Sequence, residues 1–280
     1  FEKDMEIIGL IQMTEMENKT RSEINMSFLT VSKEAVVNVS VAPRIDPGGS
    51  VRGLVVAIED ITDVSKVKNT FKRYVSKQVV DELLDDDAKL NLGGEKRDVT
   101  ILFSDIRGFT GMSEKMNPED VVSTLNEYFS EMIDIVFKHN GTLDKIIGDE
   151  LMVVYGAPTS NEDDTLRAVA TAMEMQSQIN VLNAKRIKQR KKPILAGMGI
   201  NRGIVVSGNI GSRDMMDYTV IGDTVNLGAR LCSAAGPGEI LVSSSVWKET
   251  QKHYSYKKLE PIKVKGKKNK VGVYRIDHGG

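Results

Sequence analysis

The sequence predicts an α+β protein whose larger part follows the β-α-β-β-α-β order of the ferredoxin-like split βαβ fold. The first observation is a run in which Val99, Ile101 and Phe103 alternate with other residues, the spacing of a half-buried strand. The second is the pair Gly148-Asp149, which lies between two β-type runs and is typical of a tight hairpin. The third is a pair of helical patterns, one before and one after this hairpin, followed by appended α and β segments.

The composition is that of an ordinary globular protein. Of the 280 residues, 40% are hydrophobic and 28% are charged, and the formal net charge is −1. This balance implies no strongly basic face, so we expect no nucleic-acid partner. Cys232 is the only cysteine, which predicts a packing role and a reducing, cytoplasmic compartment. Because the chain starts at Phe1 without a leader-like segment, we expect a fragment of a longer protein, for example the cytoplasmic portion of a membrane-anchored sensor.

Residues 1–62 predict a small β-rich segment. A partial helix is expected before residue 25, and strand patterns at 33–45 and 51–61 flank the turn cluster Asp46-Pro47-Gly48-Gly49. The second strand ends in Asp60-Ile61-Thr62, which resembles the last hairpin of a PAS sensor domain. A partial PAS-like sensor segment is therefore expected, and a simple hairpin extension stays open as the alternative. No residue here indicates a ligand.

Residues 63–94 predict a helical stalk followed by a linker. Val64, Val67, Phe71 and Tyr74 follow 3-4-3 spacing, and the apolar phase shifts further along the helix. This pattern favours a coiled-coil linker helix in a parallel dimer, although a surface helix on a globular core has the same periodicity. Leu92-Gly93-Gly94 is interpreted as the linker.

Residues 95–276 form the largest predicted domain, and its elements alternate in type. After the strand that ends at Asp105, a helix begins at Asn117-Pro118 and ends near His139, which we interpret as a cap. The Gly148 hairpin follows. The remaining segments are a helix at 162–182, a solvated basic loop at 185–192, strands at 196–200 and 204–206, a helix at 222–235, a strand at 239–242, a short helix at 244–250 and strands at 256–264 and 271–276.

Asp105 and Asp149 are the first candidates for chemistry, because each stands at the end of a rigid β-type run. Two carboxylates on neighbouring strands suit hard divalent cations whose shell is completed by phosphate oxygens. The stretch Gly108-Phe109-Thr110 follows, where Gly108 allows close backbone approach and successive N–H groups can cradle phosphates. Together these features indicate phosphoryl chemistry. Each aspartate taken alone is more typical of a turn or cap, and it is the surrounding stretch that favours the metal site.

The residues then match a family. From about Glu95 to Ile276 the chain resembles the catalytic domain of class III nucleotidyl cyclases. Three stretches carry the resemblance: Phe103-Ser-Asp-Ile-Arg-Gly-Phe-Thr110, Asp144-Lys-Ile-Ile-Gly-Asp149 and Tyr218-Thr-Val-Ile-Gly-Asp-Thr-Val-Asn-Leu-Gly-Ala-Arg230. Their order and spacing agree with the family as well.

The resemblance implies a head-to-tail homodimer with active sites in the shared cleft. It implies two Mg²⁺ or Mn²⁺ ions per site, held by Asp105, Asp149 and the backbone carbonyl of Ile106. Lys145 and Thr219 fall at the two positions that read the base. Many members have Asp at the second position, whereas the class IIIb subgroup has Thr, and guanylate cyclases use Glu with Cys or Ser. Class IIIb relatives are often stimulated by bicarbonate, so a bicarbonate response is worth testing.

Three further residues receive roles from the resemblance. Asn226 and Arg230 match the pair that positions the ribose and stabilises the transition state, and Lys265 matches a lysine that meets the terminal phosphates. The arginine that some relatives place on the triphosphate has no clear match. Arg202 and Arg213 lie nearby in the sequence, but neither is assigned.

The expected activity is that of an adenylate cyclase, regulated by an upstream sensor domain. ATP would give 3′,5′-cyclic AMP and pyrophosphate by in-line attack of the ribose 3′-hydroxyl on the α-phosphate. One alternative is an inactive nucleotide-binding dimerisation module, which the presence of all the matched residues disfavours. A guanylate cyclase is the second alternative, and Lys145 disfavours it.

Overall fold

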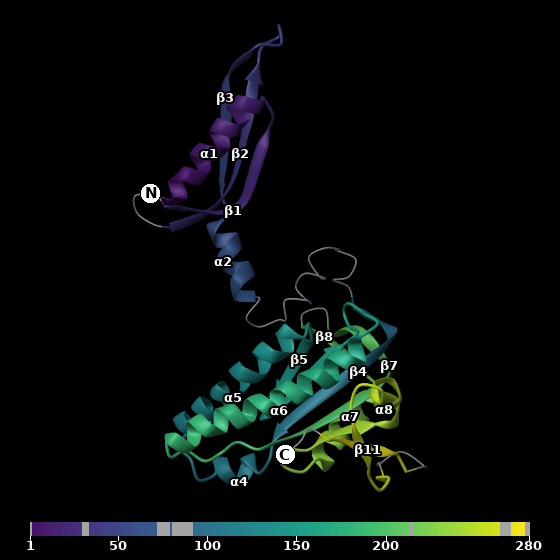
Figure 1. Ribbon diagram of the computed structural model, residues 1–280. Coiled ribbons are helices and arrows are strands. Elements are labelled where there is room, and N and C mark those ends of the chain that lie inside the picture. Colours follow the sequence, from purple (N-terminus) through teal and green to yellow (C-terminus); the bar gives the residue numbers. More distant parts are fainter. Residues whose placement is uncertain are drawn as a thin grey trace. The chain divides into compact units, whose positions relative to one another are not determined.

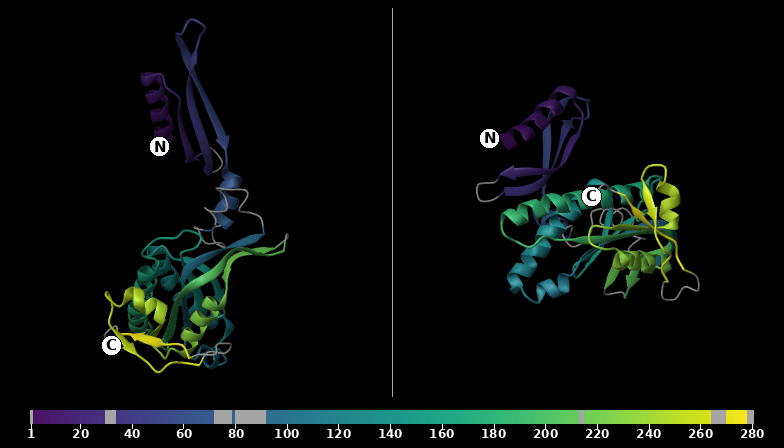
Figure 2. Two further views of the ribbon diagram at one scale, coloured as in Figure 1. Left: turned by 90° about the vertical axis from the view of Figure 1, so that its right-hand side faces the viewer. Right: turned by 60° about the horizontal axis from the view of Figure 1, so that its bottom comes forward.

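The computed structural model describes residues 2–29, 34–71, 79, 92–212, 215–263 and 270–277. The chain divides into two compact units, Phe1–Val75 and Ser76–Gly280 (Figures 1 and 2). Among the helices of the described ranges, none combines the length and the apolar character needed to cross a membrane.

The first unit is a three-stranded antiparallel sheet with one helix. Helix α1 (Glu2–Glu17) precedes strands β1 (Arg21–Leu29), β2 (Glu34–Ile45) and β3 (Val51–Asp60), which lie in the order β1-β2-β3. Alternate residues of β2 are buried, namely Ala35, Val37, Val39 and Val41. They pack against apolar residues of α1. The structure thus contains the predicted hairpin of β2 and β3. It also contains β1, which was not predicted because a register shift between Glu23 and Met26 interrupts the alternation.

The end of β3 is closed by side-chain hydrogen bonds. Asp60 accepts a hydrogen bond from the backbone N–H of Thr62 at 2.9 Å, and the Thr62 hydroxyl accepts one from the N–H of Val36 at 3.0 Å. Helix α2 (Thr62–Phe71) follows, and its seam residues Val64 and Val67 are exposed. Most of the predicted stalk lies outside the described residues. The PAS resemblance, the coiled coil and the three domain boundaries stay predictions.

The second unit contains an eight-stranded sheet. Its strands are β4 (Gly93–Ile106), β5 (Thr142–Ile147), β6 (Glu150–Tyr155), β7 (Ala196–Gly211), β8 (Met216–Ile221), β9 (Ile240–Ser243), β10 (Tyr256–Lys258) and β11 (Val273–Ile276). They lie in the order β10-β11-β9-β7-β4-β6-β5, and β8 pairs with β7. The spatial order β7-β4-β6-β5 is that of the predicted ferredoxin-like fold, which is confirmed.

Helices cover both faces of this sheet. Helices α5 (Pro118–Lys138) and α6 (Asp164–Lys188) lie side by side in Figure 1 and pack on one face, and α7 (Asp223–Ala234) packs on the other. The short helices α4 (Phe109–Ser113) and α8 (Ser244–Thr250) complete the unit. Strand β4 is therefore buried on both faces: Leu102 belongs to the core beneath α5 and α6, while Ile101 and Phe103 belong to the core beneath α7. The expectation of a half-buried strand was wrong for this reason.

Several predicted boundaries are also corrected. The Leu92-Gly93-Gly94 linker is wrong from Gly93 onward, because Gly93 and Gly94 begin β4 and pair with Asn209 and Gly208 of β7. The strands predicted at 196–200 and 204–206 are one strand, β7. Its central Asn201 resembles a turn residue, but its amide donates to the Thr224 carbonyl of α7 at 2.7 Å.

The basic stretch predicted as a solvated loop is partly helical, because α6 continues to Lys188. Arg186 is only 2% exposed, donates through Nε to the Lys192 carbonyl at 2.8 Å and pairs with Glu127 of α5. Strand β8 was not predicted, and β10 ends earlier than expected, at Lys258. The helix starting at Asn117-Pro118, the cap at His139 and the buried Cys232 agree with the predictions.

The close contact between β7 and α7 generates a stability prediction. A Cβ atom added to Gly199 would lie 2.1 Å from the Cys232 nitrogen and 2.7 Å from the Gly228 carbonyl oxygen, so backbone would have to move. Gly199→Ala is expected to lower the free energy of unfolding by about 1–3 kcal/mol, as measured by urea denaturation. Gly111→Ala, where a Cβ meets nothing within 4 Å, is the control. Equal midpoints for the two variants would contradict the proposed packing constraint.

Candidate active site

The two predicted metal aspartates lie on neighbouring strands. Asp105 is the penultimate residue of β4 and is paired with Glu150 of β6, while Asp149 occupies the turn just before β6. Gly148, with φ of 65°, adopts the left-handed conformation that this tight turn requires. The Asp149 carboxyl group is hydrogen-bonded to Asp105 and to the backbone N–H groups of Ile106 and of Asp149 itself. The structure therefore brings Asp105, Ile106 and Asp149 together.

The electrostatics of this carboxylate pair suit a cation. Burial raises the pKa of Asp149, and the hydrogen bond and negative charge of Asp105 raise it further. A divalent cation between the carboxylates would relieve this repulsion. Within the described ranges, no three His, Cys, Asp or Glu side chains are arranged for a metal. Two carboxylates and a carbonyl suffice for Mg²⁺ or Mn²⁺ when substrate phosphates and water supply the other ligands, so the donor set fits.

The predicted phosphate-cradling stretch, Gly108 to Thr110, begins two residues after Ile106. We call the segment from Asp105 to Arg107 the metal loop. Gly108 has φ of 70° and stands at the N-cap of α4, without a side-chain capping hydrogen bond. The Phe109 side chain packs against the main core, whereas Gly108 and Thr110 are exposed. Backbone and hydroxyl groups of these two residues are thus accessible beside the carboxylate pair.

Arg107 belongs to the site, although the sequence analysis gave it no role. Its guanidinium, 18% exposed, lies 3.0 Å from Asp105 Oδ2 and donates to the Cys232 carbonyl at 3.0 Å. Cys232 is buried near the end of α7. Arg107 therefore ties the metal loop to the helix that carries Asn226 and Arg230. The available signal was the position of Arg107 only two residues after Asp105, within reach of that carboxylate just past the end of β4.

Glu150 is a further carboxylate beside this loop. Burial raises its pKa to about 7, and the charge of Asp105 adds to the effect. Because it pairs with Asp105 across the two strands, it adds negative potential at the place where a cation is expected.

The predicted base-reading residues meet, although they are far apart in the sequence. Lys145 lies on β5 and Thr219 on β8, two strands that Figure 1 shows close together. Lys145 Nζ donates to Thr219 Oγ1 at 3.1 Å. Behind them lies Asp144, whose side chain is 4% exposed; it accepts from the Thr219 hydroxyl at 2.9 and 3.0 Å and pairs with Lys145 at 3.1 Å. Burial raises the pKa of Asp144, while Lys145 and Thr219 act in the opposite direction.

The remaining predicted residues lie on or near α7. Asn226 is exposed and Arg230 is half-buried, and their spacing of four places them on one face of α7. The neighbouring face, about 100° around the helix, is anchored by the buried Leu227 and Leu231. Lys265 and Arg213 lie outside the described residues. Arg202 pairs on the surface with Asp98 at 3.1 Å and Glu249 at 3.2 Å.

The comparison with family models decides the family. Residues 94–278 match the model described as adenylate and guanylate cyclase catalytic domain. The chain belongs to this family. The predicted resemblance is thereby confirmed for the catalytic part.

The cyclase domain is also similar to individual proteins of both specificities. It is 38% identical to the adenylyl cyclase CyaB of P. aeruginosa, with a TM-score of 0.64 over 66% of this chain and 96% of that one. It is 41% identical to the guanylyl cyclase Cya2, with a TM-score of 0.62 over 66% of this chain and 94% of that one. Structural similarity alone therefore leaves the base specificity open.

Curated relatives extend well beyond this chain. An uncharacterized protein of Mycobacterium tuberculosis is 33% identical over 213 residues, which are 75% of this chain and 38% of that protein. Adenylate cyclase 1 of Rhizobium meliloti is 27% identical over 209 residues, 74% of this chain and 31% of that protein. The chain thus spans about a third of the length of these relatives.

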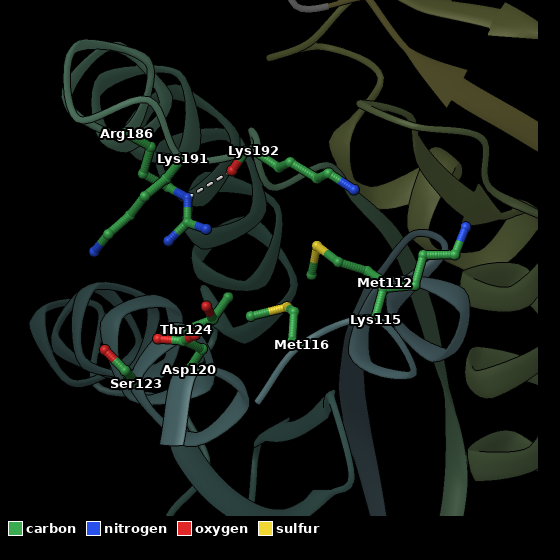
Figure 3. Close-up of a pocket in the computed structure, with 9 residues that line it drawn as sticks. All are labelled: Met112, Lys115, Met116, Asp120, Ser123, Thr124, Arg186, Lys191 and Lys192. Atoms are coloured by element: carbon green, nitrogen blue, oxygen red, sulfur yellow. Dashed lines mark hydrogen bonds between the residues drawn. The ribbon is translucent and has the colours of Figure 1, made fainter. Parts of the chain in front are cut away.

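A separate cavity of about 280 Å³ lies in the helical layer of the cyclase domain (Figure 3). Arg186 and Lys191 line one side of it, and Lys115 lies on the opposite side, with the Met112 and Met116 side chains between them. None of the predicted catalytic, metal-binding or base-reading residues contributes to its lining.

The position of Arg107 in the cyclase domain generates a second stability prediction. Arg107→Gln leaves Asp105 without its ion pair and removes a donor from the Cys232 carbonyl. We expect the free energy of unfolding to fall by about 1–3 kcal/mol, as measured by denaturant unfolding. Arg202→Gln is the matched control, because its carboxylate partners are more exposed and surface pairs contribute at most about 1 kcal/mol. A loss no larger than that of the control would argue against the anchoring role.

Proposed function

We propose that this chain is an adenylate cyclase, which converts ATP into 3′,5′-cyclic AMP and pyrophosphate. The observation that carries the proposal is the pair of Lys145 and Thr219, brought together by the fold and backed by a buried carboxylate. The Watson–Crick edge of adenine presents an acceptor at N1 and an amino donor at position 6. A lysine, which only donates, suits the first, and a hydroxyl that accepts suits the second. In the same pose, guanine would present its N1–H donor to Lys145.

The reaction proposed for the site balances without a protein nucleophile. The ribose 3′-oxygen loses its proton to solvent water and forms a bond to the α-phosphorus, while the bond from that phosphorus to pyrophosphate breaks and pyrophosphate leaves with its electron pair. Divalent cations held by Asp105, Ile106 and Asp149 would lower the pKa of the 3′-hydroxyl and neutralise phosphate charge. Asn226 would orient the ribose, and the Arg230 guanidinium would stabilise charge that develops on the transferred phosphate. Lys265 keeps its proposed contact with the terminal phosphates.

We further propose that the active site is shared between two copies of the chain. Its support is a group of exposed apolar side chains on the strands that carry or adjoin the base-reading pair, which suits a protein partner surface. These residues are Ile146, Ile147, Ile204, Val206, Met216 and Ile221. Regulation by an upstream sensor, a response to bicarbonate and a cytoplasmic location belong to the same proposal. The bicarbonate response rests on the family resemblance, the sensor on the PAS-like residues 1–62, and the cytoplasmic location on the single cysteine, Cys232.

Turnover of ATP and GTP by the purified protein, with Mg²⁺ and then Mn²⁺, tests the activity. We expect cyclic AMP and pyrophosphate from ATP, and at least about tenfold lower kcat/KM for GTP, because Lys145 meets a donor on guanine. Asp105→Ala is the inactive control, and added bicarbonate tests that response. A preference for GTP would favour a guanylate cyclase, and ATP binding without any product would favour an inactive nucleotide-binding module.

Mixing two inactive variants tests the shared site. Asp105→Ala lacks the metal half and Lys145→Ala lacks the base half, so a mixed dimer regains one intact site. We expect about a quarter of wild-type activity after random subunit exchange, since half of the dimers carry one working site of two.

The matched control mixes Asp105→Ala with Asp149→Ala, which both lack the metal half and should stay inactive. Co-purification of differently tagged copies verifies the exchange. An inactive Asp105→Ala and Lys145→Ala mixture, with exchange verified, would refute the shared site.

A further inference from the structure

We propose that Asp144 determines which base the site accepts, by fixing Thr219 as a hydrogen-bond acceptor beside the donor Lys145. Asp144 is then a positioning residue that acts through Thr219 and touches no substrate atom. The selected ligand is a purine nucleoside triphosphate with an acceptor at ring position 1 and an amino group at position 6. This inference rests on the proposed function.

The hydrogen-bond capacity of the Thr219 hydroxyl carries the argument. A hydroxyl has one proton to donate and two lone pairs to accept with. Both carboxylate oxygens of Asp144 lie close, at 3.0 and 2.9 Å, so the proton is directed to Asp144. Lys145 Nζ donates to the same oxygen at 3.1 Å and occupies one lone pair. What remains is a single lone pair, which can accept from an amino group but cannot donate to a carbonyl.

The backbone of β5 explains how neighbouring residues reach the same hydroxyl. Successive side chains of a regular strand point to opposite faces of the sheet. The pairing of β5 with β6 shifts in register between Leu143 and Lys145, which is the signature of a β-bulge at Asp144. The bulge lets Asp144 and Lys145 both meet Thr219. Asp144 is further held by a hydrogen bond from the backbone of Val220.

Replacing the carboxylate by an amide would reverse this arrangement. In Asp144→Asn, the amide oxygen would accept from the Lys145 ammonium, because the opposite orientation sets an NH₂ donor against that ammonium. The amide nitrogen then donates to Thr219, whose own proton is released toward the base. The hydroxyl can now donate to the 6-carbonyl of guanine, so discrimination against GTP weakens.

The test compares ATP and GTP in wild-type protein and in Asp144→Asn, both by kcat/KM and by dissociation constants from calorimetry. We expect the preference for ATP to fall about tenfold or more in both measurements. Asp134→Asn, which removes an exposed carboxylate from α5, should keep the wild-type preference. In a Thr219→Val background, Asp144→Asn should change the preference no further, because its route through the hydroxyl is gone.

An unchanged preference in Asp144→Asn, or an equal change in the Thr219→Val background, overturns the inference. If Asp144→Asn does not fold, the test instead compares the binding of ATP with that of purine riboside triphosphate, an analogue that lacks the 6-amino group. Wild-type protein should then bind ATP more tightly than this analogue, and Thr219→Val should lose that difference; a retained difference overturns the inference. Wild-type protein without turnover would refute the proposed function alone, since the binding measurements still test Asp144.

Discussion

Strand β4 is hydrogen-bonded along both edges, to β6 and to β7, and is covered by helices on both faces. A strand in this position tolerates no charged side chain until it leaves the core, because unpaired buried charge is costly. Asp105 stands at that exit, next to the tip of the neighbouring hairpin. The position of the carboxylate pair thus follows from the burial of the strand that carries it. The other parts of the site are arranged relative to this strand.

Helix α7 is placed by close packing on the same strands. Gly199 of β7 leaves room for the backbone of α7 at Cys232, and Gly228 of α7 lies over the ring of Phe103 of β4. Arg107 adds a polar link from the metal loop to the end of this helix. Asn226 and Arg230 therefore lie on a helix that packs close to the sheet because Gly199 and Gly228 have no side chains. The end of this helix is held by the Arg107 guanidinium.

Local signals in the sequence were sufficient for elements that depend on neighbouring residues. The Gly148-Asp149 hairpin, the α5 start at Asn117-Pro118 and the residues of the carboxylate pair are of this kind. Elements that depend on distant partners were missed or wrong. Arg186 looked solvated because Glu127 is remote in the sequence, and β7 looked interrupted at Asn201 because its partner on α7 was unknown. For the same reason the sequence predicted no role for Asp144. Its position depends on the bulge in β5, and its partner Thr219 lies on the distant strand β8.

The register of β4 also has a consequence for the order in which this domain can form during synthesis. Its first residues pair with Asn209 and Gly208, and its last with residues near Glu150, so both partners are made long after β4 itself. Pairings this distant in sequence are slow to form, because a long loop must close before they stabilise anything. On the ribosome, both edges of the apolar run of β4 therefore stay open until β6 emerges, and the edge that pairs with β7 stays open for longer. For that interval a strand that lies at the centre of the finished sheet exposes unpaired edges that can pair with other chains.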